Sequence, residues 1–354
     1  MRAVQVDSTP SPTAAGPEAL NWGEAPRPTV RPGDVLIQVS AAGLNRADLL
    51  QRQGLYPPPE GASTILGLEC SGTVVELGNL VDPAWMGRRV CALLEGGGYG
   101  ELCAARVDLL IPLDEHLSDV AAAAIPEALA TSWLNLFSIG QLKPGETVLV
   151  QGASSGIGTI SVQLARTAGC RVIATASSER KRQACLELGA DAALDYSSAD
   201  LANQILDLTG GAGADLVLDN VGPSNLDLYA RFLAVGGRVM MIGTQGGREG
   251  SFNAGPLMAK QARLFPTSLR RTPADAKAAL FRTLRSEAWP MITMGQVLPV
   301  IDSVYSFTEA DLAHHRLESG DHIGKLVLVA ESVDSCSRLG MHPMSTMSAS
   351  DNVP

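Results

Sequence analysis

The sequence predicts an α/β protein in which a small β-barrel accompanies a doubly wound parallel sheet. Three observations lead to this prediction. Short strands separated by turns fill the first third of the chain, strands and helices alternate from residue 147 to residue 242, and a glycine-rich turn stands at the start of that alternation. Because the chain has 354 residues, which is too many for one small core, we expect two domains.

The N-terminal third is typical of a small, irregular barrel. Its β-rich segments are short and are bounded by turn residues such as Pro32-Gly33. A proline-rich polar region at 8–31 and a stiff extended loop at 56–59 interrupt them. The expected strands are residues 2–6, 34–40, 72–77 and 89–94, with a short helix at 47–53.

An alanine-rich helical pattern at 119–124 and 129–139 leads into the alternating part of the chain. We expect strands at 147–150, 171–175, 192–195, 215–218 and 238–242, and helices from 156 and at 179–188, 201–208 and 226–233. This pace of alternation is typical of a parallel sheet covered by helices on both faces. Further elements are expected as helices at 272–285 and 309–317 and as strands at 302–305 and 325–329. The polar, aperiodic residues 331–354 are interpreted as a disordered tail.

The glycine-rich turn is the strongest candidate for a binding site. The buried strand Thr147–Val150 runs through it into a helix that opens at about Gly156. The first N–H groups of a helix have no intrahelical partner, so they bind phosphate well. The spacing is G-x-x-x-G-x-G, and a glycine trio alone is weak evidence, but the first turn of such a sheet is where dinucleotides bind. The candidate phosphate-binding residues are Gly152, Ala153, Ser154, Ser155, Gly156, Ile157 and Gly158.

Composition excludes several classes of function. The formal net charge of −10 argues against a nucleic-acid partner. The N-terminus has no basic segment followed by an apolar run, so no signal peptide is expected, and no apolar stretch is long enough to span a bilayer. The six cysteines lack C-x-x-C spacing, which favours reduced thiols. We therefore expect a cytoplasmic protein without a membrane partner.

Three stretches of the chain carry a resemblance to a known family. They are Leu44-Asn45-Arg46-Ala47-Asp48 continued by Gln51-Arg52-x-Gly54-x-Tyr56, then Leu66-Gly67-Leu68-Glu69-Cys70-Ser71-Gly72, and Ala124-Ile125-Pro126-Glu127. Over residues 1 to about 330, the chain resembles the quinone oxidoreductase branch of the medium-chain dehydrogenase/reductase superfamily. The resemblance implies a GroES-like catalytic domain at 1–126 and 265–330, a Rossmann-type nucleotide-binding domain at 127–264, and a homodimer formed through a sheet edge.

Many members of this superfamily bind zinc, and the sequence argues against zinc here. Those members have Cys where this chain has Asn45, and His where it has Leu68. A carboxamide and an aliphatic side chain are not zinc ligands. The region 91–103 has only two cysteines, whereas a structural zinc site needs four. We therefore predict no metal, and we expect Glu69 to hydrogen-bond inside the barrel rather than to act in catalysis.

The expected cofactor is NADPH. An NAD-selective site has Asp or Glu at the end of the second strand of the sheet, whereas this chain has Ala176. Ser178 can donate a hydrogen bond to a 2′-phosphate, and Lys181 can supply charge. The resemblance implies that Lys181 and Tyr196 contact this phosphate. The basic run 180–182 could also be the solvated face of a helix, and this alternative stays open.

Without zinc there is no Lewis acid, which suits a substrate that is already electron-poor, such as a quinone or a conjugated enal. The resemblance implies that Asn45 and Tyr56 face the cleft between the domains as candidate catalytic residues. Tyr56 could donate a hydrogen bond to a quinone or enone oxygen or could wall the pocket, and Asn45 could bond the carboxamide or ribose of the cofactor. Gly243 and Ser268 follow late strands, where the cofactor loops of the family fall.

Three other functions compete with a quinone oxidoreductase. A short-chain dehydrogenase shares the glycine spacing but needs a catalytic Tyr-x-x-x-Lys, and none of the five tyrosines has Lys four residues later. An NADPH-dependent enal or enone reductase of the same fold remains open. So does a non-catalytic NADPH-binding sensor or structural protein.

Overall fold

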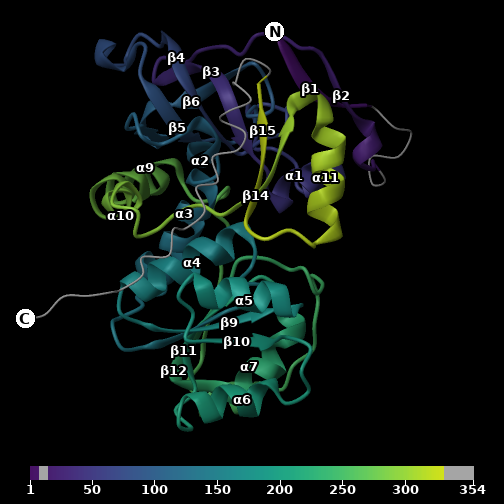
Figure 1. Ribbon diagram of the computed structural model, residues 1–354, viewed down its shortest axis with the longest axis vertical. Coiled ribbons are helices and arrows are strands. Elements are labelled where there is room, and N and C mark those ends of the chain that lie inside the picture. Colours follow the sequence, from purple (N-terminus) through teal and green to yellow (C-terminus); the bar gives the residue numbers. More distant parts are fainter. Residues whose placement is uncertain (8–14, 331–354) are drawn as a thin grey trace, which may run out of the picture.

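The structure is a computed structural model and describes residues 1–7 and 15–330. Figure 1 shows two lobes along the long axis. One lobe contains the barrel strands and the N-terminus, and the other contains a parallel sheet with its helices. The predicted α/β fold class is confirmed. The predicted tail at 331–354 lies outside the described residues. None of the described helices has the length and apolar character that a membrane crossing requires.

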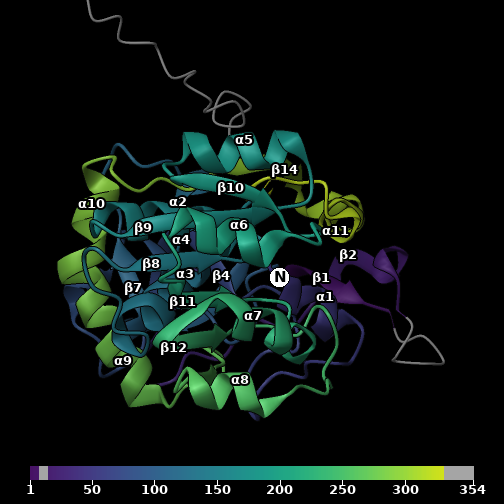
Figure 2. The same cartoon turned by 90° about the horizontal axis from the view of Figure 1, so that it is seen from below.

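The parallel sheet has six strands in the order β10-β9-β8-β11-β12-β13, and Figure 2 shows the first five of these one after another. The strands are β8 (Thr147–Val150), β9 (Arg171–Ala176), β10 (Ala192–Asp195), β11 (Ala214–Asp219), β12 (Leu233–Met241) and β13 (Arg263–Pro266). The chain winds outward from β8 in one direction and from β11 in the other. The strand order therefore reverses between β8 and β11. Ligands of such sheets bind at this reversal, beyond the carboxyl ends of the strands.

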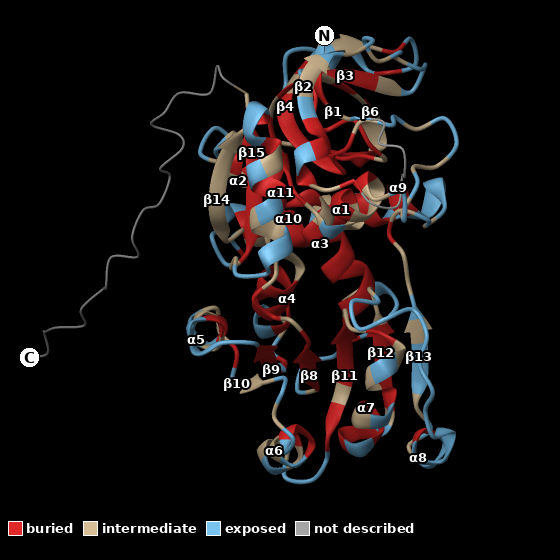
Figure 3. Cartoon of the chain, turned by 90° about the vertical axis from the view of Figure 1, so that its right-hand side faces the viewer, coloured by how far each residue is buried: buried red, intermediate tan, exposed pale blue. Residues whose placement is uncertain are grey.

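Both faces of the parallel sheet are covered, which explains its apolar strands. The helices of this lobe are α4 (Gly156–Thr167), α5 (Glu179–Glu187), α6 (Leu201–Leu208), α7 (Leu226–Phe232) and α8 (Ala254–Ala259). Val148 and Val150 pack on the face that is covered by α4, whereas Leu149 packs on the face that is covered by α6 and α7. In Figure 3, β8 is accordingly buried along its length, β11 along most of its length, and α8 is largely exposed.

The barrel lobe is built on a mixed sheet in the order β14-β15-β3-β4-β5-β7, with β6 paired to β3. Its strands are β3 (Asp34–Gly43), β4 (Glu69–Leu77), β5 (Arg89–Leu93), β6 (Leu102–Arg106), β7 (Leu110–Pro112), β14 (Ile301–Ser306) and β15 (Lys325–Val329). A separate pair is formed by β1 (Arg2–Val6) and β2 (Leu20–Glu24), and 3₁₀ turns lie at Pro17–Ala19, Pro83–Trp85, Val107–Leu109, Pro223–Asn225 and Phe307–Glu309. Because β15 pairs antiparallel with β3, the C-terminal part of the chain returns into the N-terminal barrel.

Helices join the two lobes through one apolar core. They are α2 (Asp119–Ala123), α3 (Pro126–Trp133), α9 (Ala274–Thr283) and α10 (Trp289–Thr293), with π-helical turns at Leu134–Ser138 and Leu284–Ala288. The other two helices are α1 (Arg46–Arg52) and α11 (Ala310–Ser319), and α11 packs on the barrel core instead. A single cluster of buried side chains runs from Ile111 of the barrel through Leu129 of α3 to Val148 of the parallel sheet and Phe281 of α9. This continuous packing fixes the lobes against each other.

The structure differs from the sequence-based expectation at several strands. The expectation omits β2, β6, β7 and β13, and β12 begins at Leu233, whereas a helix was expected up to that residue. The sequences of β6 (LCAAR) and β13 (RLFP) carry few β-branched residues, so local propensity is weak and pairing with neighbours decides their conformation. Helix α3 begins three residues earlier than predicted, with Pro126 in its first turn.

A buried arginine offers a test of the parallel lobe. Arg238 of β12 donates hydrogen bonds to the carbonyls of Gly140 (2.7 Å) and Asp215 (3.0 Å), and it pairs with Glu146 at 2.6 Å. Arg238→Met leaves these acceptors without a donor, so we expect the free energy of unfolding to fall by about 3 kcal/mol in urea denaturation. The control Arg27→Met breaks an exposed ion pair with Glu76 and should cost less than about 1 kcal/mol. Equal losses in the two variants would contradict the expectation.

Candidate active site

A cavity of about 880 Å³ lies between the barrel and the parallel sheet. Residues from both lobes line it, among them Asn45, Tyr56 and Glu127 from the barrel side and Gln151 and Asn220 from the ends of β8 and β11. Its volume falls within the range of sites for small molecules and cofactors. The cavity lies where the strand order of the parallel sheet reverses, which is the expected position for a ligand.

The glycine turn forms one wall of this cavity. Ser155 caps α4, because its hydroxyl accepts a hydrogen bond from the Gly158 N–H at 3.1 Å. A Cβ at Gly158 would lie 2.6 Å from the backbone of Ala153, so this position has no room for a larger residue. The turn at residues 152–158, called the phosphate cradle below, brings backbone N–H groups to the start of a helix of 12 residues. Such an arrangement fits a phosphate group. Of the seven predicted phosphate-binding residues, six line the cavity, and Ala153 is buried behind them.

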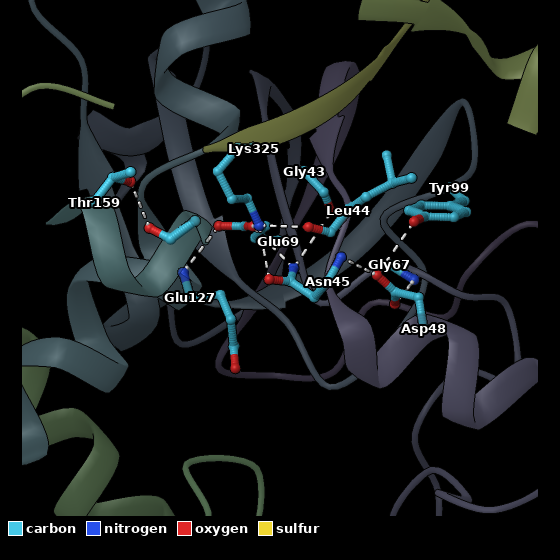
Figure 4. A network of polar contacts seen from close by, with 11 residues as sticks. Gly43, Leu44, Asn45, Asp48, Gly67, Glu69, Tyr99, Glu127, Thr159 and Lys325 are labelled. Atoms are coloured by element: carbon cyan, nitrogen blue, oxygen red, sulfur yellow. Dashed lines mark hydrogen bonds and ion pairs between the residues drawn. The ribbon is translucent and has the colours of Figure 1, made fainter. Parts of the chain in front are cut away.

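A buried ion pair stands beside the cradle (Figure 4). Lys325, the first residue of β15, donates hydrogen bonds to Glu69 Oε1 at 2.6 Å, to Asn45 Oδ1 at 2.7 Å and to the Leu44 carbonyl at 2.6 Å. Asn45 Nδ2 donates to the same Glu69 oxygen at 2.9 Å. The side chains of Lys325 and Glu69 are 4% and 0% exposed. As expected from the sequence, Glu69 hydrogen-bonds inside the barrel lobe.

Sequence reasoning missed Lys325. The one signal was a lysine at the start of an otherwise apolar strand, KLVLV, and a lysine at a strand end is ordinarily solvated. Lys325 donates to the oxygen of the Asn45 carboxamide, and the nitrogen of that carboxamide donates to Glu69. Asn45 therefore belongs to this network, and it also lines the cavity. Its assignment as a catalytic residue stays a prediction.

The arrangement around Glu69 does not fit a zinc ion. An ammonium group lies within hydrogen-bond distance of both Glu69 and Asn45 and would repel a divalent cation. Leu68 offers no donor atom. In residues 1–7 and 15–330, no cluster of three or more His, Cys, Asp or Glu side chains is placed to hold a metal.

Glu127 is the second acidic residue of this region. Its backbone N–H donates to Glu69 Oε2 at 2.9 Å, while its carboxyl group points away from the network in Figure 4 and contributes to the cavity lining. Burial raises the pKa of this carboxyl to about 8, and the neighbouring charge of Glu69 acts in the same direction.

Tyr56 and Ser268, predicted for different roles, lie together. The Tyr56 hydroxyl and Ser268 Oγ are 3.2 Å apart, although 212 positions separate them in the chain. Arg270 lies over the Tyr56 ring, with its guanidinium carbon 4.9 Å from the ring centre. It also donates to Gln51 Oε1 and to the Glu95 carbonyl, both at 2.7 Å. Sequence reasoning missed Arg270, which joins the loop after β13 to the barrel.

The far end of the cavity contains the residues predicted for a 2′-phosphate. Ala176, Ser177, Lys181 and Tyr196 line it. Ser178 instead caps α5, because its hydroxyl accepts from the Lys181 N–H at 3.4 Å. The Lys181 ammonium donates to the Gly320 carbonyl, and burial lowers the pKa of Lys181. Gly243, after β12, also lines the cavity.

Comparisons with known proteins agree with this architecture. Residues 31–115 match the alcohol dehydrogenase GroES-like domain, and residues 156–285 match the zinc-binding dehydrogenase family. Quinone oxidoreductase of Rattus norvegicus is 30% identical over 332 residues, which cover 93% of this chain and 98% of the relative. The crystal structure of Escherichia coli quinone oxidoreductase complexed with NADPH has a TM-score of 0.83 at 26% identity and covers 93% of this chain and 100% of that chain.

The chain also matches part of a much larger protein. A phenolphthiocerol/phthiocerol polyketide synthase of Mycobacterium tuberculosis is 34% identical over 315 residues, or 88% of this chain. This chain spans only 14% of the length of that relative.

The buried ion pair can be tested by a double-mutant cycle. Lys325→Met leaves the Glu69 carboxylate buried without its cation, so we expect the free energy of unfolding to fall by about 3–5 kcal/mol. Lys325→Met combined with Glu69→Gln removes both charges and should recover most of that loss, as measured by urea denaturation. A double variant no more stable than Lys325→Met would show that Glu69 is not held by Lys325.

Proposed function

The chain belongs to the medium-chain dehydrogenase/reductase superfamily, in its quinone oxidoreductase-like branch, and from this premise we propose that it is a zinc-independent NADPH:quinone oxidoreductase. One observation supports this function above the others. A single cavity joins a phosphate cradle, a strand end without an acidic residue and the Tyr56–Ser268 hydroxyl pair. Within the branch, the sequence motifs resemble the tumour-suppressor-inducible quinone oxidoreductases more closely than zeta-crystallin.

NADPH is the proposed cofactor. The glycine turn fits its pyrophosphate, and Ala176 at the end of β9 leaves room for a 2′-phosphate without charge repulsion. Lys181 and Tyr196 line the same end of the cavity and are the proposed phosphate contacts. When bound, NADPH supplies a hydride. The related Escherichia coli quinone oxidoreductase is complexed with NADPH, which favours the same cofactor here.

The side chains of this protein would orient and enclose the substrate. The Tyr56 and Ser268 hydroxyls can donate hydrogen bonds to a carbonyl oxygen, and Arg270 holds the Tyr56 ring in place. The Lys325 ammonium lies against Glu69 and Asn45, where it would repel a divalent cation, so the proposed reaction uses no Lewis acid. The substrate must therefore bring its own electrophilic centre, as a quinone does.

A second candidate is the reduction of the carbon–carbon double bond in an enal, an enone or a related conjugated acyl group. The matches to polyketide synthases favour it, and one such relative, from Aureobasidium melanogenum, is a highly-reducing polyketide synthase that is 29% identical over 333 residues. Such a substrate is also electron-poor, so the same cavity chemistry serves it.

We also propose a cytoplasmic location and a homodimer. Five buried cysteines in the described chain are free thiols, which suits a reducing compartment. Strand β13 forms an edge of the parallel sheet and is largely exposed, and an unpaired edge can pair with a second copy.

The cofactor proposal rests on Lys181. Lys181→Ala removes a charge-assisted contact with the 2′-phosphate, so we expect the KM for NADPH to rise about tenfold while the KM for NADH stays unchanged. The matched control is Lys143→Ala, at an exposed lysine outside the cavity. Steady-state assays with both nucleotides test this, and an unchanged KM for NADPH would contradict the assignment of Lys181.

The substrate class rests on Tyr56. Stopped-flow oxidation of NADPH should be faster with quinones than with 2-enals, and Tyr56→Phe should lower kcat/KM about tenfold because it removes one hydrogen bond to the substrate. Tyr305→Phe, at a half-buried tyrosine of β14, is the matched control. Faster turnover of 2-enals would favour the second candidate. Intact NADPH binding without turnover would favour a non-catalytic sensor.

A further inference from the structure

Glu127 carries a carboxyl group that the binding roles above do not use. It follows Pro126 in the first turn of α3 and lines the cavity. Its backbone N–H is engaged with Glu69, but within residues 1–7 and 15–330 its carboxyl oxygens have no hydrogen-bonding partner. Figure 4 shows the carboxyl directed away from the ion pair. An acid left without a partner in a binding cavity is available to a ligand.

Charged groups from four elements surround this carboxyl. Glu69 of β4 and Asp48 of α1 disfavour its ionised form, while Lys325 of β15 and Arg270 after β13 favour it. Removal from water is the largest influence, and the balance raises the pKa of Glu127 from 4.5 to about 8. At neutral pH the group therefore holds a proton, beside a Glu69 that is already paired with Lys325.

We propose that Glu127 is the proton donor that completes reduction of the substrate in this cavity. This inference rests on the proposed quinone reductase function. When bound, NADPH would supply a hydride to one carbonyl oxygen of the quinone, and the second oxygen would then carry the negative charge. The O–H bond of Glu127 breaks as its proton forms the new O–H bond of the hydroquinone. The Glu127 carboxylate recovers a proton from solvent, so one NADPH and one proton are consumed for each quinone.

In this proposal, Tyr56 and Ser268 orient the substrate, and Glu127 supplies the proton. The Tyr56 and Ser268 hydroxyls, bonded to each other, are suited to fix the position of a carbonyl oxygen. A carboxyl that titrates close to the operating pH is the more effective acid, because proton donation is fastest when the pKa of the donor matches that pH. The charge of Glu69 helps to keep the proton on Glu127, whereas the charge of Lys325 acts in the opposite direction.

The kinetic test compares three variants. Glu127→Gln removes the proton but keeps the size of the side chain, and we expect kcat to fall about 100-fold with no change in the dissociation constant of NADPH. Glu127→Asp retains an acid and should restore part of kcat. The matched control Glu115→Gln changes an exposed glutamate outside the cavity and should leave kcat unchanged. The kcat of the unmodified protein should decline above about pH 8, and this decline should be absent in Glu127→Gln.

A stability measurement tests the same proton without turnover. Because the folded-state pKa is raised, the carboxyl contributes its full stability below pH 4.5 and loses it progressively as pH rises to about 8. The Tm of Glu127→Gln minus that of the unmodified protein should therefore grow between pH 5 and pH 8 and then level off. A difference that does not vary with pH would overturn the proposal.

The outcomes distinguish the proton-donor role of Glu127 from the proposed quinone reductase function. If the unmodified protein reduces quinones with NADPH and Glu127→Gln matches Glu115→Gln in kcat, Glu127 is not the donor, although the proposed function stands. If the unmodified protein binds NADPH but reduces no quinone, the proposed function fails and the proton-donor role fails with it.

Discussion

The contact between Lys325 and Glu69 is the constraint on which the rest of the site depends. It joins the last strand of the barrel sheet to β4 and, through Asn45, to the start of α1. Lys325 can reach Glu69 only because residue 156 is glycine, since a Cβ there would lie 2.3 Å from Lys325 Cδ. The neighbouring Gly324 N–H donates to the Ser154 carbonyl at 2.8 Å. The glycine turn and the side of the cavity that contains Asn45 are therefore held by the same short segment.

This contact also fits the zinc-independent function that we propose. Replacement of ligands by Asn45 and Leu68 would by itself leave a buried carboxylate at Glu69 without a counterion, at a cost of several kcal/mol. An ammonium group supplied by β15 fills that role with three hydrogen bonds. The ammonium balances the buried carboxylate. Under the proposed function, the substrate must therefore be electrophilic without help from a metal.

Much of the fold could be predicted from the sequence because its signals are local. Strands β8, β10 and β15 lie where the apolar runs predicted them, and the glycine turn marks the start of α4. The pairs that build the site are different in kind. Lys325 meets Asn45 across 280 positions, and Tyr56 meets Ser268 across 212. No periodicity or spacing records such contacts, since they arise only when the C-terminal part of the chain returns to the barrel. The residue types alone did not indicate that Lys325, Arg270 and the carboxyl of Glu127 would lie at the cavity.

The position of Lys181 has a consequence for how a ligand enters. Its ammonium already serves the Gly320 carbonyl, and Arg180 beside it serves the Asp321 carbonyl. These two bonds fasten α5 to the segment between α11 and β15. An ammonium carries three N–H donors and the bond to Gly320 uses one, so an anion can bind Lys181 while this contact stays in place. The Gly320 contact therefore holds the long Lys181 side chain at this end of the cavity before a ligand arrives, so less side-chain entropy is lost when an anion binds there.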